Sequence, residues 1–127
     1  MLRYIELKTG HSDNGPAWIA RVTLSKSGRT VYFNGRALKR SNRGGIEGNH
    51  FDMRTNEEYW VSGVKKDGLD RHWAGSGAVA IEASAVAEYL QEIGAAQLDR
   101  RRFRVISDLP ETDPTAFDDV VHARLRE

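Results

Sequence analysis

Hydrophobic and polar residues alternate along much of the first 80 residues, with the period of two that is typical of half-buried β-strands. Near the amino terminus, Ile5 and Leu7 alternate with charged neighbours, which predicts a first strand. A second strand carries Trp18, Ala20, Val22 and Leu24 on one face. A third alternation directs Val31 and Phe33 inward. The pattern predicts a β-rich body.

Turn signals separate these strands at short intervals. Residues 25–28 favour a hairpin connection, and Asn34-Gly35 is a strong hairpin signal because both residue types tolerate positive φ. Residues 66–68 predict another bend. Further short strands are expected at 36–40, 48–52, 58–65 and 78–81. Short strands at this spacing predict a small barrel or a strongly bent antiparallel sheet.

The period becomes helical after residue 82. Ser84 is the expected N-cap of a helix at 84–93, and Gly94 is expected to end it in the left-handed conformation. Its apolar stripe is Val86, Tyr89, Leu90 and Ile93. An edge strand is then expected within 100–106, and Asp113-Pro114 predicts the start of a helix near 113–126.

These elements predict an α+β fold. Its centre is a small bent antiparallel sheet that resembles an SH3-like barrel and is closed by the helix at 84–93. The expected domains are 1–94, a barrel-like domain with its closing helix, and 95–127, a C-terminal extension with a strand and a helix.

Composition narrows the possible functions. The chain of 127 residues contains no cysteine, which excludes thiol catalysis, thiolate zinc sites and disulfides. No run approaches the ~18 apolar residues of a membrane span, and the amino terminus lacks the apolar core of a signal peptide. A cytoplasmic protein without a membrane partner is expected.

Positive charge is concentrated in one region although the net charge is only +1. Residues 21–46 contain no acidic residue and seven basic ones. The basic residues are Arg21, Lys26, Arg29, Arg36, Lys39, Arg40 and Arg43. Such a region attracts anionic partners, or it protects exposed strand edges from pairing. Arg36, Lys39, Arg40 and Arg43 are therefore candidate binding residues.

The segment from Gly48 to Gly77 concentrates aromatic and titratable residues. Tyr59 and Trp60 are adjacent on one strand and must face opposite sides, so one is expected in the core. Trp60, Arg71, His72 and Trp73 are candidates for a stacking or hydrogen-bonding pocket, or they close the barrel.

The same segment supports an enzymatic alternative. A small hydrolase is possible if His50, Asp52, Asp70 and His72 converge in one cleft. The sequence contains no HExxH spacing and no nucleophile elbow, so we assign no catalytic residue, no metal site and no cofactor.

The C-terminal extension has two features that concern partners. The run Arg100–Arg104 is interpreted as charges on an edge strand or as phosphate contacts. Phe117, Val120, Val121 and Leu125 form an apolar stripe that could dock on a protein partner or form a dimer.

Several motifs support a family resemblance over about residues 3–93. They are Tyr4-Ile-Glu-Leu-Lys-Thr-Gly10, Asp13-Asn-Gly-Pro-Ala-Trp18, Val31-Tyr-Phe-Asn-Gly35 with Ala37-Leu-Lys39, Glu58-Tyr-Trp-Val-Ser-Gly-Val-Lys65, and Asp70-Arg-His-Trp73. With these motifs the chain resembles a family of short bacterial proteins of unknown function, some labelled 1-deoxy-D-xylulose-5-phosphate synthase. A thiamine-diphosphate synthase requires several large domains, and this chain is one small domain. The resemblance implies a common β-rich fold and no catalytic residues.

The sequence therefore predicts a non-enzymatic binding module for a protein or an anionic polymer such as nucleic acid. The alternatives are the small hydrolase and an interaction partner that neutralises another protein.

Overall fold

The computed structural model describes residues 1–8, 15–41, 48–68 and 77–120. The strands are β1 (Leu2–Lys8), β2 (Ala17–Arg21), β3 (Thr23–Leu24), β4 (Thr30–Phe33), β5 (Arg36–Arg40), β6 (His50–Asp52), β7 (Glu58–Ser62), β8 (Val79–Glu82) and β9 (Phe103–Ile106). The helical elements are the 3₁₀ turn η1 (Ala83–Ala85), the helix α1 (Val86–Ile93) and the 3₁₀ turn η2 (Pro114–Phe117). The combination confirms the α+β class. None of the described helices is both long and apolar enough to cross a membrane.

The described strands form one mixed sheet in the order β3-β4-β5-β6-β7-β1-β2-β8-β9. Neighbours from β3 to β2 are antiparallel, as the hairpin signals predict. β8 runs parallel to β2, and β9 runs parallel to β8. The prediction of an antiparallel sheet is wrong for these two strands. A helix lies between β8 and β9 in the chain, and such a crossover returns the chain to the start of the next strand.

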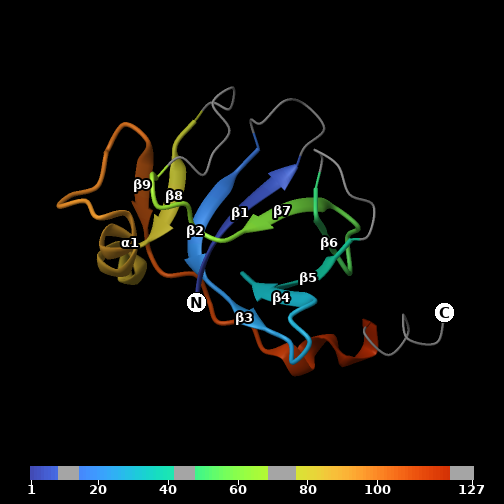
Figure 1. Cartoon of the computed structure of the whole chain (residues 1–127). Helices are drawn as coiled ribbons and strands as arrows, with labels where there is room; N and C mark the ends of the chain where they lie inside the picture. The colour runs from blue at the N-terminus through green and yellow to red at the C-terminus, as the bar shows by residue number, and fades with distance from the viewer. Residues whose placement is uncertain (9–14, 42–47, 69–76, 121–127) are drawn as a thin grey trace.

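A bend at Val22 makes the sheet curl. Before the bend, β2 pairs with β1, and after it, β3 pairs with β4. The Val22 N–H donates to the Met1 carbonyl at 3.0 Å, in register with the β1–β2 pairs, so this ladder extends to the bend and the next residues pair with β4 instead. Because β4 leads back through β5, β6 and β7 to β1, the two ends of the bent segment lie on opposite sides of a barrel-like curl (Figure 1).

The inside of the curl is an apolar core, here called the inner cluster. Its buried members are Ile5, Ala20, Val31, Phe33, Leu38, Tyr59 and Val61, with Leu7, Trp18, Val22, Leu24 and Leu109 packed against them. The predicted apolar face of residues 17–24 is confirmed, because Trp18, Val22 and Leu24 all contact this cluster. Val31 and Phe33 are also inside, as their alternation predicts.

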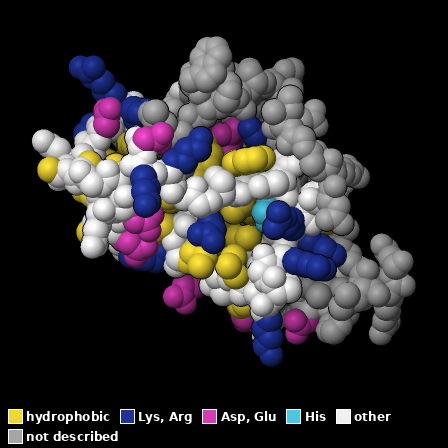
Figure 2. All heavy atoms as spheres, in the orientation of Figure 1, with side chains coloured by type: hydrophobic (Ala, Val, Ile, Leu, Met, Phe, Trp, Pro, Cys, Tyr) yellow, Lys and Arg dark blue, Asp and Glu magenta, His cyan; other side chains and the backbone are white. Residues whose placement is uncertain are grey.

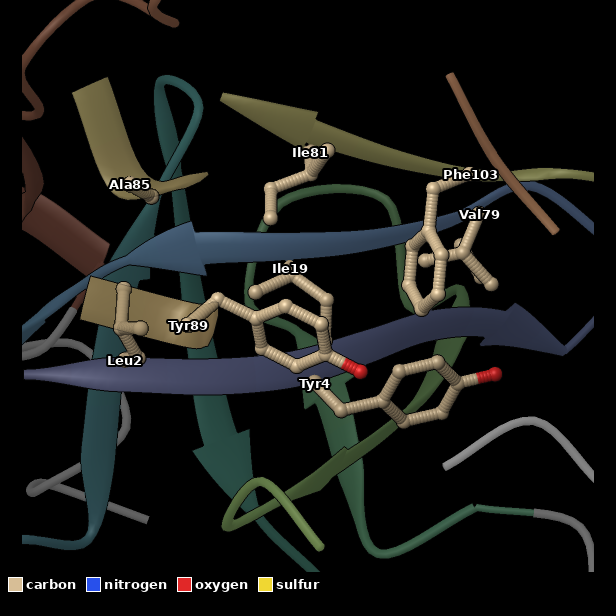
Figure 3. Close-up of a cluster of buried hydrophobic side chains, with 9 residues drawn as sticks. Leu2, Tyr4, Ile19, Val79, Ile81, Ala85, Tyr89 and Phe103 are labelled. Carbon is tan, nitrogen blue, oxygen red and sulfur yellow. The ribbon is translucent and has the colours of Figure 1, made fainter. Parts of the chain in front are cut away.

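The helix α1 covers the outer face of β1, β2, β8 and β9. Tyr89 of α1 is fully buried against Tyr4, Ile19 and Ile81, and its ring centroid lies 5.3 Å from that of Phe103 (Figure 3). This helix-side cluster is separate from the inner cluster, so both faces of β2 are buried. A two-sided core explains why residues 17–20 contain almost no polar side chain.

The ends of α1 follow different rules. Gly94 ends the helix with φ of 68°, as predicted. The predicted N-cap is wrong, because Ser84 lies within η1 and the helix begins at Val86. A residue that is distant in the chain accepts a hydrogen bond from a backbone N–H just before the helix. Asp108 Oδ1 accepts from the Ser84 N–H at 3.0 Å.

The described part of the C-terminal extension packs on all three apolar clusters. Phe103 belongs to the helix-side cluster and Leu109 contacts the inner cluster. Phe117 is buried with Tyr32 and Ala37 in a third, hairpin-side cluster whose other members are Met53, Phe51 and Val120. The domain boundary at Gly94 stays a prediction.

The start of the last helical segment is confirmed. The Asp113 side chain accepts from the Thr115 N–H at 2.9 Å, and Pro114 is the first residue of η2. Phe117 and Val120, half of the predicted docking stripe, face the molecule's own sheet. Val121 and Leu125 lie outside the described residues.

Candidate functional site

One arginine lies at each end of β5, and the two have different surroundings. Arg36 Nη1 lies 2.6 Å from Asp52 Oδ2 and 3.5 Å from Glu57 Oε1. The other oxygen of Asp52, Oδ1, accepts from the backbone N–H groups of Arg54 at 2.8 Å and Thr55 at 3.2 Å. Both oxygens of this buried carboxylate are therefore used to hold the turn between β6 and β7 to β5.

These contacts determine the protonation state of Asp52. Burial by itself raises the pKa of Asp52, but the hydrogen bonds from Arg36 and from the two backbone N–H groups outweigh it, and the pKa is lowered. The Asp52 side chain therefore stays charged and paired at neutral pH. A group of this kind stabilises the fold and is poorly suited to proton transfer at neutral pH.

Arg40, at the other end of β5, lies opposite His50 of β6. Its backbone N–H donates to the Arg29 carbonyl at 2.8 Å, so Arg29 is its neighbour on the β4 side. Both arginine side chains are exposed. Among the described residues, neither Arg29 nor Arg40 takes part in an ion pair. We call Arg29, Arg40 and His50 the basic lip.

His50 is held as a neutral ring in this positive environment. Burial lowers the pKa of His50 first, and the charge of Arg40 lowers it further, to about 4. The Asn49 amide, which lies between β6 and β7, determines the tautomer. Its Nδ2 donates to the Val61 carbonyl at 2.7 Å and its Oδ1 accepts from the Val61 N–H at 2.8 Å.

The same Asn49 oxygen lies 2.9 Å from His50 Nδ1. Because an amide oxygen only accepts, His50 Nδ1 carries the proton and Nε2 is left as an acceptor. Gly48 makes this arrangement possible, since a Cβ at that position would lie 2.9 Å from the Tyr59 carbonyl oxygen. The sequence features behind the lip are therefore the consecutive residues Gly48, Asn49 and His50.

Figure 2 shows hydrophobic side chains in the centre of the face seen in Figure 1, with Lys and Arg side chains around them. Arg40 is two residues from Leu38 of the inner cluster on β5 and therefore on the same face of the sheet. The lip thus borders the apolar interior of the curl. A ligand on this face would meet positive charge and apolar contacts together.

The predicted binding residues do not share one surface. Lys39 is half-buried and pairs with Phe51 on the hairpin-side face, opposite to the face of Arg40. Trp60 packs against the helix-side cluster, whereas Tyr59 is in the inner cluster, so the prediction that one of the two is core is confirmed. Arg43, Arg71, His72 and Trp73 lie outside the described residues.

The hydrolase hypothesis is only partly visible in the structure. His50 and Asp52 are on the same face of β6, but Asp52 is bound to Arg36 and His50 to Asn49. Asp70 and His72 lie outside the described residues, so the four side chains cannot be placed together. Within the described part of the chain, no cluster of histidine, aspartate or glutamate is arranged to hold a metal ion.

Two buried carboxylates were not singled out from the sequence. Glu6 accepts from the Tyr4 hydroxyl at 2.5 Å and lies 2.9 Å from Lys8 Nζ. Glu82 accepts from the backbone N–H groups of Arg21 and Leu109 and so fastens the segment after β9 to the sheet. Residues 4, 6 and 8 share one face of a strand, and this alternation could have indicated the contacts of Glu6. No local sequence pattern indicates those of Glu82.

A cleft of about 210 Å³ lies between the end of β8, the β4–β5 turn and residues 108–112. Glu82 and Asp108, which line it, already accept hydrogen bonds from the chain. Thr112 closes its far side, where its hydroxyl accepts from the Gly35 N–H at 2.7 Å. The polar groups of this cleft join the C-terminal segment to the body of the protein.

Comparison with known proteins leaves the residues as the only guide to function. No protein-family model matches the chain, and no curated protein or solved structure matches it either.

Proposed function

We propose that the protein is a non-enzymatic binding module, built on an SH3-like barrel, that binds an anionic polymer at the basic lip. Single-stranded nucleic acid is the polymer with the best fit. Its phosphates would contact Arg29 and Arg40, and its bases would lie on the apolar centre of the same face. A cytoplasmic location belongs to the same proposal.

One observation carries this proposal: two neighbouring, exposed arginines have no carboxylate partner among the described residues. Arg36, Arg21 and Arg54 do have such partners, which are Asp52, Glu88 and Asp119. The arginines at 100–104 also lack a described ion-pair partner, but only Arg29 and Arg40 are neighbours across two paired strands beside His50. The pKa of His50 reports the same local field, because Arg40 contributes to lowering it. A phosphate brought to the lip would compensate this field.

The hydrolase alternative has less support. An acid–base catalyst needs a titratable group that can exchange protons near neutral pH. The pKa of His50 is about 4, and Asp52 has a lowered pKa and two occupied oxygens. The half of the quartet that can be described therefore has a structural role.

The test is a titration of a fluorescein-labelled oligothymidine into the protein, with anisotropy as the readout and salt as the variable. The double variant Arg29→Ala/Arg40→Ala is expected to bind more weakly and to reduce the salt slope by about 1.4, because each phosphate contact to a single strand contributes ~0.7. The matched control is Arg100→Ala/Arg101→Ala, which removes two exposed arginines from the far edge of the sheet.

Binding that is insensitive to salt, or a control pair that loses as much as the lip pair, would refute the lip as the site. Absence of binding together with capture of an acidic protein would assign the lip to a protein partner instead.

A further inference from the structure

β9 is an edge strand with β8 on one side only in the described part of the sheet. Val79 N–H donates to the Arg102 carbonyl at 2.8 Å, and the Cα partners are Val79 and Phe103 at the start of the pair. In a parallel ladder alternate residues direct their backbone groups to the neighbour. Arg104 and Ile106 therefore face β8, whereas the Val105 N–H and carbonyl point to the outer edge.

The side chains of β9 separate by face. Phe103 is buried against α1, and Val105 on the same face is 38% exposed, one of two large hydrophobic residues so exposed in the described ranges. Arg104 lies on the opposite face and is exposed. The edge thus has one apolar face and one cationic face, and the outward backbone groups of Val105 between them have no hydrogen-bond partner among the described residues.

Charge around the edge favours one kind of partner. Residues 99–108 contain four arginines and two aspartates, which leaves a local charge of +2. Each aspartate accepts a backbone hydrogen bond, Asp99 Oδ1 from the Arg101 N–H and Asp108 Oδ1 from the Ser84 N–H. The four arginines have no ion-pair partner among the residues that the structure describes.

Pairing of β9 with β9 of a second copy would place two segments with a local charge of +2 side by side, and like charges on paired strands are destabilising. The same charges attract an acidic strand. We propose that the outer edge of β9 binds an extended acidic segment of a partner protein, which adds a strand to the sheet.

The geometry also specifies the sequence pattern of this segment. Because side chains alternate across a strand, the residues beside Arg104 would be Glu or Asp, and those beside Val105 would be apolar. An alternating acidic–apolar segment therefore matches both faces of the edge. This site is separate from the basic lip, since four strands, β6, β7, β1 and β2, lie between β5 and β8 in the sheet order.

A short peptide of alternating glutamate and valine, labelled with fluorescein, provides the test with the full chain. We expect saturable binding that weakens with salt, and loss of binding when the peptide backbone is N-methylated at alternate residues. Val105→Pro removes the outward N–H and leaves the β8 ladder intact, since proline is tolerated on the free side of an edge strand. It is expected to weaken binding about tenfold.

A second variant keeps the test decisive if Val105→Pro disturbs folding. Arg104→Glu changes one exposed side chain and is expected to reverse the preference, so that a lysine–valine peptide binds better than the glutamate–valine peptide. Lys26→Glu, which reverses one exposed charge in the β3–β4 turn outside both proposed sites, is the matched control and should leave the binding of both peptides unaffected.

Three results of the peptide titrations would overturn the proposal. They are no saturation by the glutamate–valine peptide, equal binding of both peptides to wild type, and no change of preference in Arg104→Glu. A wild-type dimer in size-exclusion chromatography that Val105→Pro dissociates would show that a second copy occupies the edge, and this too would overturn it.

Discussion

Arg36 and Arg40 begin and end the same strand, yet one is part of the structure and the other is available. Arg36 reaches a buried carboxylate that in turn holds two backbone N–H groups. Arg40 lies beside a histidine that burial keeps neutral, so nothing described at that end compensates its charge. The residue that β6 presents to each end of β5 therefore decides whether a cation stabilises the fold or can bind a ligand.

The largest expected effect is at the compensated end. Asp52→Ala leaves Arg36 without its closest partner and two turn N–H groups without an acceptor, so the free energy of unfolding should fall by about 3–4 kcal/mol. Urea denaturation measures this change. Asp119→Ala removes the exposed partner of Arg54 and is the control, in which no change is expected. A small loss in Asp52→Ala would remove the distinction between the two ends of β5.

The next effect is the acid sensitivity that His50 introduces. The ring has a pKa of about 4 in the folded chain and about 6.5 when unfolded, so unfolding takes up a proton between these values. The contribution of His50 to the free energy of unfolding should be fully present above pH 6.5. It should fall by about 2–3 kcal/mol as the pH drops to 4.

The loss contributed by Asp52 has a different window. The pKa of Asp52 is lowered in the fold, so its contribution is present above the unfolded value of about 4 and disappears below it. His50→Gln should flatten the curve between pH 6.5 and 4 and leave the steeper loss below pH 4. A His50→Gln curve parallel to that of the wild type would contradict this assignment.

A smaller effect compares the two arginines directly. Arg36→Ala is expected to lower the free energy of unfolding by about 1–2 kcal/mol, because Asp52 stays buried without its partner. Arg40→Ala removes an exposed side chain and should change it by less than about 0.5 kcal/mol. Equal losses in the two variants would show that Arg40 also has a structural partner.

The smallest effect concerns the field at the basic lip. Arg40→Ala should raise the pKa of His50 above about 4, because the second cause of its lowering is removed while burial remains. A proton NMR titration of the His50 ring measures this shift. Lys39→Ala is the control, since Lys39 faces the other side of the sheet. An unchanged His50 pKa in Arg40→Ala would mean that the charge of Arg40 does not act there.

Local features were predictable from the sequence because each depends on a few neighbouring residues. Asn34 and Gly35 adopt φ of 49° and 73° in the β4–β5 turn, and Gly94 ends α1, as their residue types favour. Asp113 caps η2 for the same reason. The inward faces of β2 and β4 follow from alternation alone.

The candidate site was less predictable, because its residues are distant in sequence. Arg36 and Asp52 are 16 positions apart, and only the pairing of β5 with β6 makes them partners. The basic region of the sequence was correctly seen as positive, but the strand pleat puts Lys39 and Arg40 on opposite faces. Arg29 joined the site because β4 and β5 pair in one particular register.

The sequence by itself determined the α+β class, the hairpin turns, the apolar strand faces and the ends of some elements, since these depend on φ preferences and on periodicity. Tertiary structure decided the order of the strands, the parallel addition of β8 and β9, and the choice of which cations are paired. These depend on contacts between segments brought together by folding. Arg36 and Arg40 are the same residue type on one strand, and only the side chain across the sheet makes them different.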